Sequence, residues 1–199
     1  MSADSKADFN PEVLKGLIEA LLTKAKALPK TSMQKLLYLI EREFILEHKK
    51  LAVGLKYRHE SFGMYSPDLA NFLDGLVTIG FLDSAGVSSD LGQGKRYMLK
   101  DKKRIAIPDN LKNVVDRVYE KFGKLSMTEL MREAKNTAPF IYSKRGEWLD
   151  WNLLIEEVCL GAHDLTPEIE RQLRQAQEQE RQGKLRNMTP EEALELLEQ

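Results

Sequence analysis

The chain has 199 residues, of which 42% are hydrophobic, and it can bury one ordinary core with a small added layer. Its 30 basic and 31 acidic side chains leave a net charge of −1, so attraction to nucleic acid would need a local patch. The apolar runs fall well short of the roughly 20 residues that span a bilayer, and we expect no membrane association. The single cysteine, Cys159, excludes an internal disulfide and favours a cytoplasmic location.

The first predicted helix begins at Pro11. Asn10 can cap this helix and Pro11 suits its first turn, while apolar residues recur at helical spacing. Pro29 is expected to end it. Residues 1–30 therefore form an N-terminal helix that should pack on the core.

A second helix is predicted from Thr31, which with Gln34 matches a capping box. Apolar residues cover most of its surface, which favours a central position in the core. Its charged residues, among them Lys35 and Glu41, are expected to keep one narrow side in solvent. After Gly54, the alternation of Leu55–His59 predicts a short, half-exposed strand.

Ser66 and Pro67 open another helix, which Gly80 should close in a Schellman-type turn. Two extended segments, Phe81–Ser88 and Lys95–Lys100, follow and are separated by a loose turn. This order predicts a mainly α fold with a small β-hairpin wing, an α+β class. We expect a winged-helix-like helical domain over residues 31–160.

Two further helices are predicted after the wing. The first follows Pro108 and stops at Gly123, and the second begins with a capping box formed by Ser126 and Glu129. We expect them to pack as an antiparallel pair. A last apolar cluster follows, with these members: Trp148, Trp151, Leu154, Ile155 and Val158.

Residues 161–199 form an acidic appendage, with 5 basic and 9 acidic side chains, a net charge of −4 that leaves +3 on residues 1–160. This segment reads as an extended C-terminal helical tail with few apolar residues. Its candidate anchors for a partner are Leu173, Leu194 and Leu197. A polar helix of this kind suits folding upon a partner, although lying on its own domain or pairing with a second copy is an equal alternative.

No reaction centre is indicated by the sequence. The three histidines and Cys159 lack the close spacing of metal ligands, and no glycine-rich phosphate loop opens a helix. Ser61 or Ser66 beside His59 could form a nucleophilic pair, but serines before a helix are far more often caps. We therefore predict no catalytic, metal or cofactor residues and a non-enzymatic protein.

The strongest local charge is a basic group at the end of the wing: Lys95, Arg96, Lys100, Lys102, Lys103 and Arg104. It could contact phosphates, attract an acidic protein, or lie in solvent as a strand end. The preceding helix contains Asp68 and Asp74 and no Lys or Arg, which argues against DNA binding through that helix.

An aromatic group lies on or near the edge of the predicted hairpin: Tyr57, Phe62, Tyr65 and Tyr97. Most of it is expected in the core. Any exposed part would be a candidate protein-binding surface, with Tyr65 and Tyr97 as platform residues.

Three segments carry a family resemblance: Met33–Tyr38, Phe62–Leu69 and Gly80–Leu82. They resemble the YwgA-like proteins and, more distantly, the SocA-like antitoxin domain called Panacea. Its pattern is a "QKLLY" helix, an aromatic turn ending in serine, and a helix that ends in glycine followed by apolar residues. The resemblance implies a helical domain with a small wing and, for the Panacea branch, antitoxins that neutralise toxins by direct binding.

These observations give a first hypothesis of a regulatory, antitoxin-like module that binds a protein partner through the tail and the wing. The partner would be a toxin or another regulated protein, and a homodimer is possible. The alternative is a winged-helix DNA-binding transcriptional regulator that uses the basic group of the wing.

Overall fold

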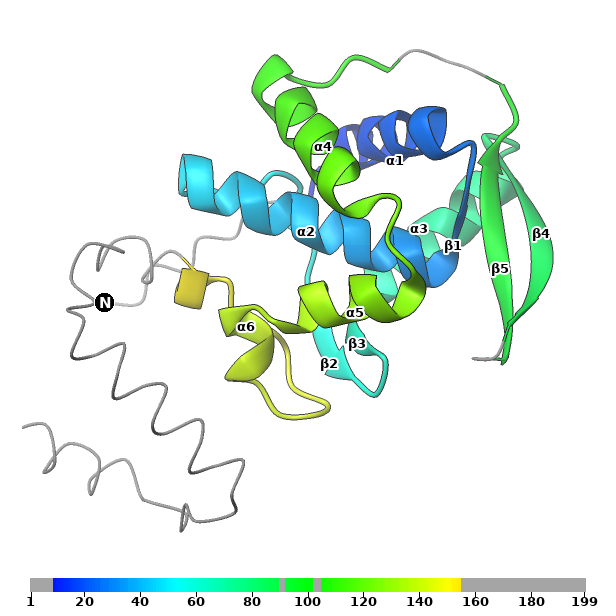
Figure 1. The fold of residues 1–199 in the computed structure, drawn as a ribbon. Coiled ribbons are helices and arrows are strands. Elements are labelled where there is room, and N and C mark those ends of the chain that lie inside the picture. The colour runs from blue at the N-terminus through cyan, green and yellow to red at the C-terminus, as the bar shows by residue number, and fades with distance from the viewer. Residues whose placement is uncertain (1–8, 90–91, 102–104, 155–199) are drawn as a thin grey trace, which may run out of the picture. The chain divides into compact units, whose positions relative to one another are not determined.

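The computed structural model describes residues 9–89, 92–101 and 105–154 (Figure 1). The chain divides into two compact units, residues 1–156 and 157–199, and everything described belongs to the first. The predicted class, mainly α with a small β-hairpin, is confirmed. The elements in chain order are α1 (Pro11–Ala25), β1 (Ala27–Pro29), α2 (Lys30–His48), β2 (Arg58–Glu60), β3 (Gly63–Tyr65), α3 (Pro67–Thr78), β4 (Leu82–Ser89), β5 (Gly92–Leu99), α4 (Asp109–Phe122), α5 (Met127–Lys135) and α6 (Ala138–Ile141).

Helix α1 begins at Pro11 as predicted, with the Asn10 side chain accepting a hydrogen bond from the backbone N–H of Val13 at 3.1 Å. It ends at Ala25, before the expected stop at Pro29. The chain then turns into β1, which pairs antiparallel with β5. A proline is tolerated there because β1 is an edge strand, in a sheet of order β1-β5-β4.

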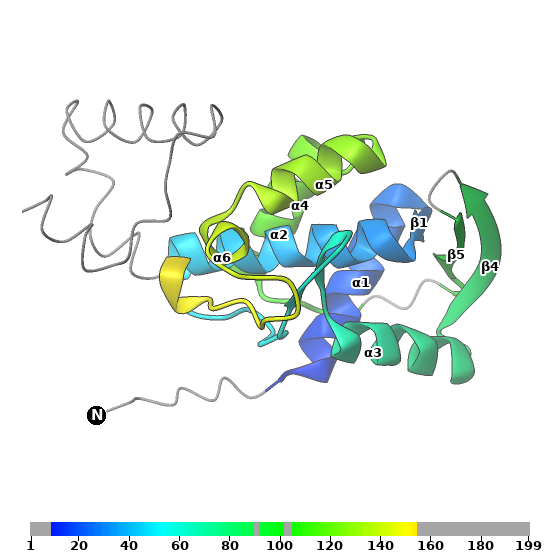
Figure 2. The same ribbon diagram turned by 90° about the horizontal axis from the view of Figure 1, so that it is seen from below.

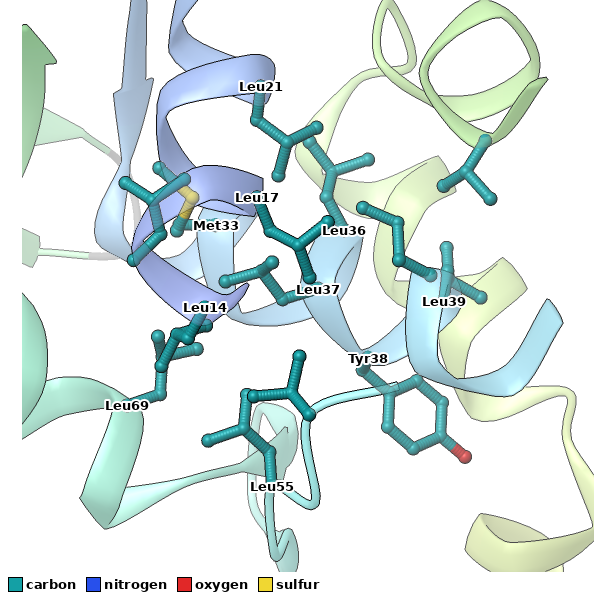
Figure 3. Close-up of a cluster of buried hydrophobic side chains, with 14 of the residues drawn as sticks. Leu14, Leu17, Leu21, Met33, Leu36, Leu37, Tyr38, Leu39, Leu55 and Leu69 are labelled. Atoms are coloured by element: carbon teal, nitrogen blue, oxygen red, sulfur yellow. The ribbon is translucent and has the colours of Figure 1, made fainter. Parts of the chain in front are cut away.

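Helix α2 runs through the middle of the first unit, with the other helices arranged around it (Figures 1 and 2). Its buried side chains meet those of α1, of α3 and of the segment before β2, as Figure 3 shows for Leu17, Leu36, Leu55 and Leu69. The predicted capping box at its start is wrong. Pro29 occupies the cap position without a side-chain hydrogen bond, and the Gln34 amide is bonded elsewhere.

Helix α3 has the caps that its sequence predicts. The Ser66 hydroxyl accepts a hydrogen bond from the N–H of Leu69 at 3.2 Å. At the other end Gly80 has a φ of +72°, and the N–H of Phe81 bonds to the carbonyl of Leu76 at 2.9 Å. The two-stranded wing, β4 and β5, follows directly and pairs antiparallel along its length.

The strand predicted at Leu55–His59 is shifted toward β2, which pairs with β3 in a second small sheet. The capping box of α5 is confirmed, because Ser126 and Glu129 bond to each other's backbone N–H. We expected α4 and α5 to pack mainly on each other as an antiparallel pair, but each packs on other elements. Helix α4 packs on α1 and α2, whereas α5 packs on α2 and β3.

The apolar cluster predicted after α6 is divided. Trp151 is buried and stacks on Tyr38 with 5.0 Å between ring centroids, and Leu154 is also buried. Trp148 is 54% exposed. Ile155 and Val158 lie outside the described residues. Within the described part of the chain, no helix has the length and apolar character needed to cross a membrane.

Candidate functional site: a basic pocket at the start of α2

A pocket of about 540 Å³ lies between the start of α2, the β2–β3 hairpin and β5. This volume is within the range of small-molecule sites. Four cations, one carboxylate and two aromatic rings contribute to its wall. The lining residues are Lys30, Thr31, Gln34, Lys35, Arg58, Glu60, Phe62, Gly63, Tyr65, Gly94 and Lys95.

Consecutive residues of α2 fix one wall of this pocket. The Gln34 amide donates to the carbonyl of Ser66 at 2.9 Å and accepts from the N–H of the same residue at 2.9 Å. The Lys35 ammonium donates to the carbonyl of Met64 at 2.5 Å. Together they attach the β3–α3 junction to α2 and set the position of the cap of α3.

Lys35 is a buried cation, with only 3% of its surface exposed. Within the described residues it forms no salt bridge, and the neighbouring charge is a second lysine, Lys135. Burial, followed by the repulsion of Lys135, lowers the pKa of Lys35 to about 8. An ion in this position is stabilised by hydrogen bonds and by any anion that reaches it.

The other cations of the pocket are paired. Lys95 and Lys30 lie 2.9 and 3.7 Å from the carboxylate of Asp74 on α3. The hydrogen bond from Lys95 is the main reason that the pKa of Asp74 lies below its usual value. Arg58 forms a salt bridge with Glu60. Among the described residues, Lys35 and Lys135 form no salt bridge, and the two lysines that share Asp74 leave one further positive charge at this end of α2.

The two tyrosines predicted as platform residues have different positions. Tyr65 is half-buried and lines the pocket. Tyr97 has no exposed surface, and its hydroxyl donates to Asp74 at 3.3 Å. Burial and the Asp74 carboxylate raise the pKa of Tyr97. The expectation that Tyr97 contacts a partner directly is corrected, because its ring faces the core as an inward position of β5.

The predicted basic group is only partly described. Lys95 lines the pocket, while Arg96 and Lys100 are exposed and lie outside it. Lys102 and Lys103 fall outside the described residues. The same holds for the three anchors proposed in the tail, Leu173, Leu194 and Leu197.

The pairing of His59 with Ser61 or Ser66 does not form. The His59 Nδ1 lies 3.0 Å from the hydroxyl and 3.0 Å from the carbonyl of Ser143, and the ring stacks on Phe140. Ser66 is buried and serves as the cap of α3. Within the described residues, no three His, Cys, Asp or Glu side chains gather as metal ligands would.

Sequence reasoning missed the role of the charged residues on α2. Lys35 and Glu41 were expected in solvent, yet they are 3% and 1% exposed. The Glu41 carboxylate accepts hydrogen bonds from the N–H groups of Ala52, Val53 and Gly54 at 3.0–3.2 Å. Burial raises the pKa of Glu41 to about 7, against the effect of these bonds. An available signal was the apolar pair beside each charge, Leu36 and Leu37 after Lys35 and Leu39 and Ile40 before Glu41.

The elements define a mainly helical domain with a small sheet, built around α2, and the pocket lies at the start of that helix. A family model described as "Antitoxin SocA-like, Panacea domain" matches residues 33–139, from α2 into α6. The chain therefore belongs to the SocA-like Panacea antitoxin family. Comparison with curated proteins and with solved structures found no match. The closer resemblance to YwgA-like proteins stays a prediction.

Proposed function

We propose that this protein is a cytoplasmic, non-enzymatic antitoxin that binds and neutralises a protein toxin. The observation that carries the proposal is the family match, which covers more than half of the chain. The match includes Gln34, Lys35 and the whole β2–β3 hairpin, so most of the pocket lining lies within the family domain, with Lys30 and Thr31 just before it.

The contacts are proposed to come from the acidic tail and from the surface beside the wing. In the tail, the sparse apolar residues Leu173, Leu194 and Leu197 would be the anchors of a helix that folds on the toxin. Tyr65 and the exposed Phe62 would supply aromatic contacts on the domain. The acidic composition of residues 161–199 favours a basic toxin surface.

A growth experiment tests this proposal. The genes on each side of this one in the source genome are expressed alone, and those that stop growth are expressed again with the full chain. We expect restored growth with one of them, and a stable complex of the two purified proteins. Leu194→Ser with Leu197→Ser should abolish rescue, while Glu120→Ala, an exposed change on α4, should not. Failure of every neighbour to be toxic or to be rescued would contradict the proposal.

DNA binding is a second candidate, favoured by one specific arrangement. Helix α1 precedes β1, α3 precedes β4, and the strands lie in the order β1-β5-β4, as expected of a winged helix. Asp74 is paired with two lysines, which weakens the electrostatic argument against α3 as a DNA-facing helix. Arg96 and Lys100 remain exposed on the wing.

A gel shift with duplex DNA separates the two candidates. A DNA-binding protein should retard the duplex at micromolar concentration, lose affinity steeply with added salt, and depend on Arg96 and Lys100. The absence of retardation at low ionic strength would remove this candidate. Light scattering on the same sample reports whether the chain forms a dimer.

A further inference from the structure

The pocket at the start of α2 combines a buried, unpaired cation with an opening to solvent. Lys35 donates one hydrogen bond, to Met64, although an ammonium has three donors. No carboxylate of the described residues forms a salt bridge with it. A buried ion without a partner is costly, and a bound anion would remove that cost.

The start of α2 adds to the attraction for an anion. Pro29 has no side chain that could accept from the first N–H groups of the helix, and Lys30 and Thr31 line the pocket. The N-terminal end of a helix with unsatisfied N–H groups favours negative charge. Arg58, in the same wall, is bonded to Glu60 through Nε and Nη2, and its Nη1 group is the donor that a second oxygen would meet.

Two aromatic side chains line the pocket beside its charged residues. Phe62 lies at the turn between β2 and β3 and is 57% exposed, although it is a large apolar side chain. Tyr65 lines the same space. A planar ring bound at this rim would cover Phe62 and gain stacking energy.

We propose that this pocket binds an organic phosphate that carries a planar ring, of the mononucleotide class, with the phosphate at Lys35 and the ring beside Phe62. The inference does not depend on the antitoxin function, because it rests on the lining of the pocket alone. A ligand there would contact α2, the β2–β3 hairpin and the part of β5 near the tip of the wing, and so would link these three elements.

Calorimetric titration of the full chain with AMP, with inorganic phosphate and with adenosine tests the proposal. We expect AMP to bind, phosphate to bind more weakly, and adenosine not to bind detectably. Lys35→Met, which removes the charge at similar volume, should weaken AMP binding by at least about tenfold, the loss of one charged hydrogen bond. Lys124→Met, an exposed change between α4 and α5, should bind AMP like the natural protein.

Two further measurements keep the test decisive. Without ligand, Lys35→Met should unfold at the same or a higher temperature, because it removes an unpaired buried charge. Phe62→Ala, an exposed change, should weaken binding of AMP and leave binding of phosphate unchanged. The proposal is overturned if the natural protein binds neither AMP nor phosphate, or if the affinity for AMP is the same in Lys35→Met and Phe62→Ala as in the natural protein.

Discussion

Helix α2 buries one charged side chain in each half, and the two differ in how completely they are bonded. Toward its C-terminal half, Glu41 accepts hydrogen bonds from three consecutive backbone N–H groups of residues 52–54. Toward its N-terminal end, Lys35 donates to a single carbonyl and borders a pocket. A buried charge that is fully bonded holds the fold together, whereas one that is partly bonded can still accept a ligand.

Glu41 also organises the connection that follows α2. The loop of residues 49–57 must return to the core, and its N–H groups would be unsatisfied without Glu41. The carboxylate acts as a template for this loop and brings Leu55 and Tyr57 into the core. In the other half of the helix, Gln34 acts in the same way on the backbone of Ser66.

The largest expected effect is that of removing the template carboxylate. Glu41→Ala leaves three buried or half-buried N–H groups without an acceptor, and we expect the free energy of unfolding to fall by about 3–5 kcal/mol. Urea unfolding followed by circular dichroism at pH 7 measures this. Glu120→Ala, an exposed change on α4, is the matched control and should change stability by less than about 0.5 kcal/mol. Equal stability of the two variants would show that Glu41 is not needed for the loop.

The pH dependence of stability follows from the same residue. The pKa of Glu41 rises from 4.5 to about 7 on folding, so the folded state binds more protons between these values. The contribution of this proton binding to the free energy of unfolding is therefore fully present at pH 4.5 and below. It decreases by up to about 3 kcal/mol as the pH rises to about 7. The difference in stability between the natural protein and Glu41→Gln, measured from pH 5 to pH 8, isolates this residue. A constant difference over that range would contradict the raised pKa.

Local signals in the sequence predicted the helix ends well. Asn10, Ser66, Gly80 and Ser126 act within a few residues of their own position, so their partners are visible in the sequence. Gln34 matched a capping box but bonds Ser66, which is 32 residues away. The long-range bond to Ser66 takes the place of the local capping bond, and residue spacing alone does not predict which of the two forms.

The site was less predictable than the fold, for a related reason. Charged residues are almost always exposed, so a solvent-facing position for Lys35 and Glu41 was the natural expectation. Their burial depends on backbone groups of distant loops that offer hydrogen bonds. Strand β1 was missed for the same reason, because three residues form a strand only when β5 lies beside them. The tyrosines illustrate the limit further: both were expected as platform residues, and pairing with β1 and β4 on both sides of β5 buries Tyr97.

An intermediate effect is expected from the amide that joins α2 to α3. Gln34→Ala removes two hydrogen bonds and leaves the buried N–H of Ser66 without a partner, while the Ser66 carbonyl keeps its bond from the N–H of Ala70, and the change should cost about 2 kcal/mol. Asn71→Ala, on the exposed face of α3, is the control. Lys35→Met sharpens the comparison, because we expect it to cause no loss of stability. If Lys35→Met were as destabilising as Gln34→Ala, the lysine would belong with Glu41 as a purely structural charge.

The smallest effect is expected from the ion pair at the outer edge of the pocket. Lys95 and Asp74 are 54% and 44% exposed, and a pair in such a position contributes only about 0.2–1 kcal/mol because water and salt screen it. Lys95→Met should therefore lower stability by less than about 1 kcal/mol, and by still less in high salt. Chemical unfolding at low and high ionic strength measures both values, with the exposed Lys112→Met as control. A larger, salt-independent loss would mean that the wing depends on this pair, because Tyr97 shares the Asp74 carboxylate and links it to the buried core.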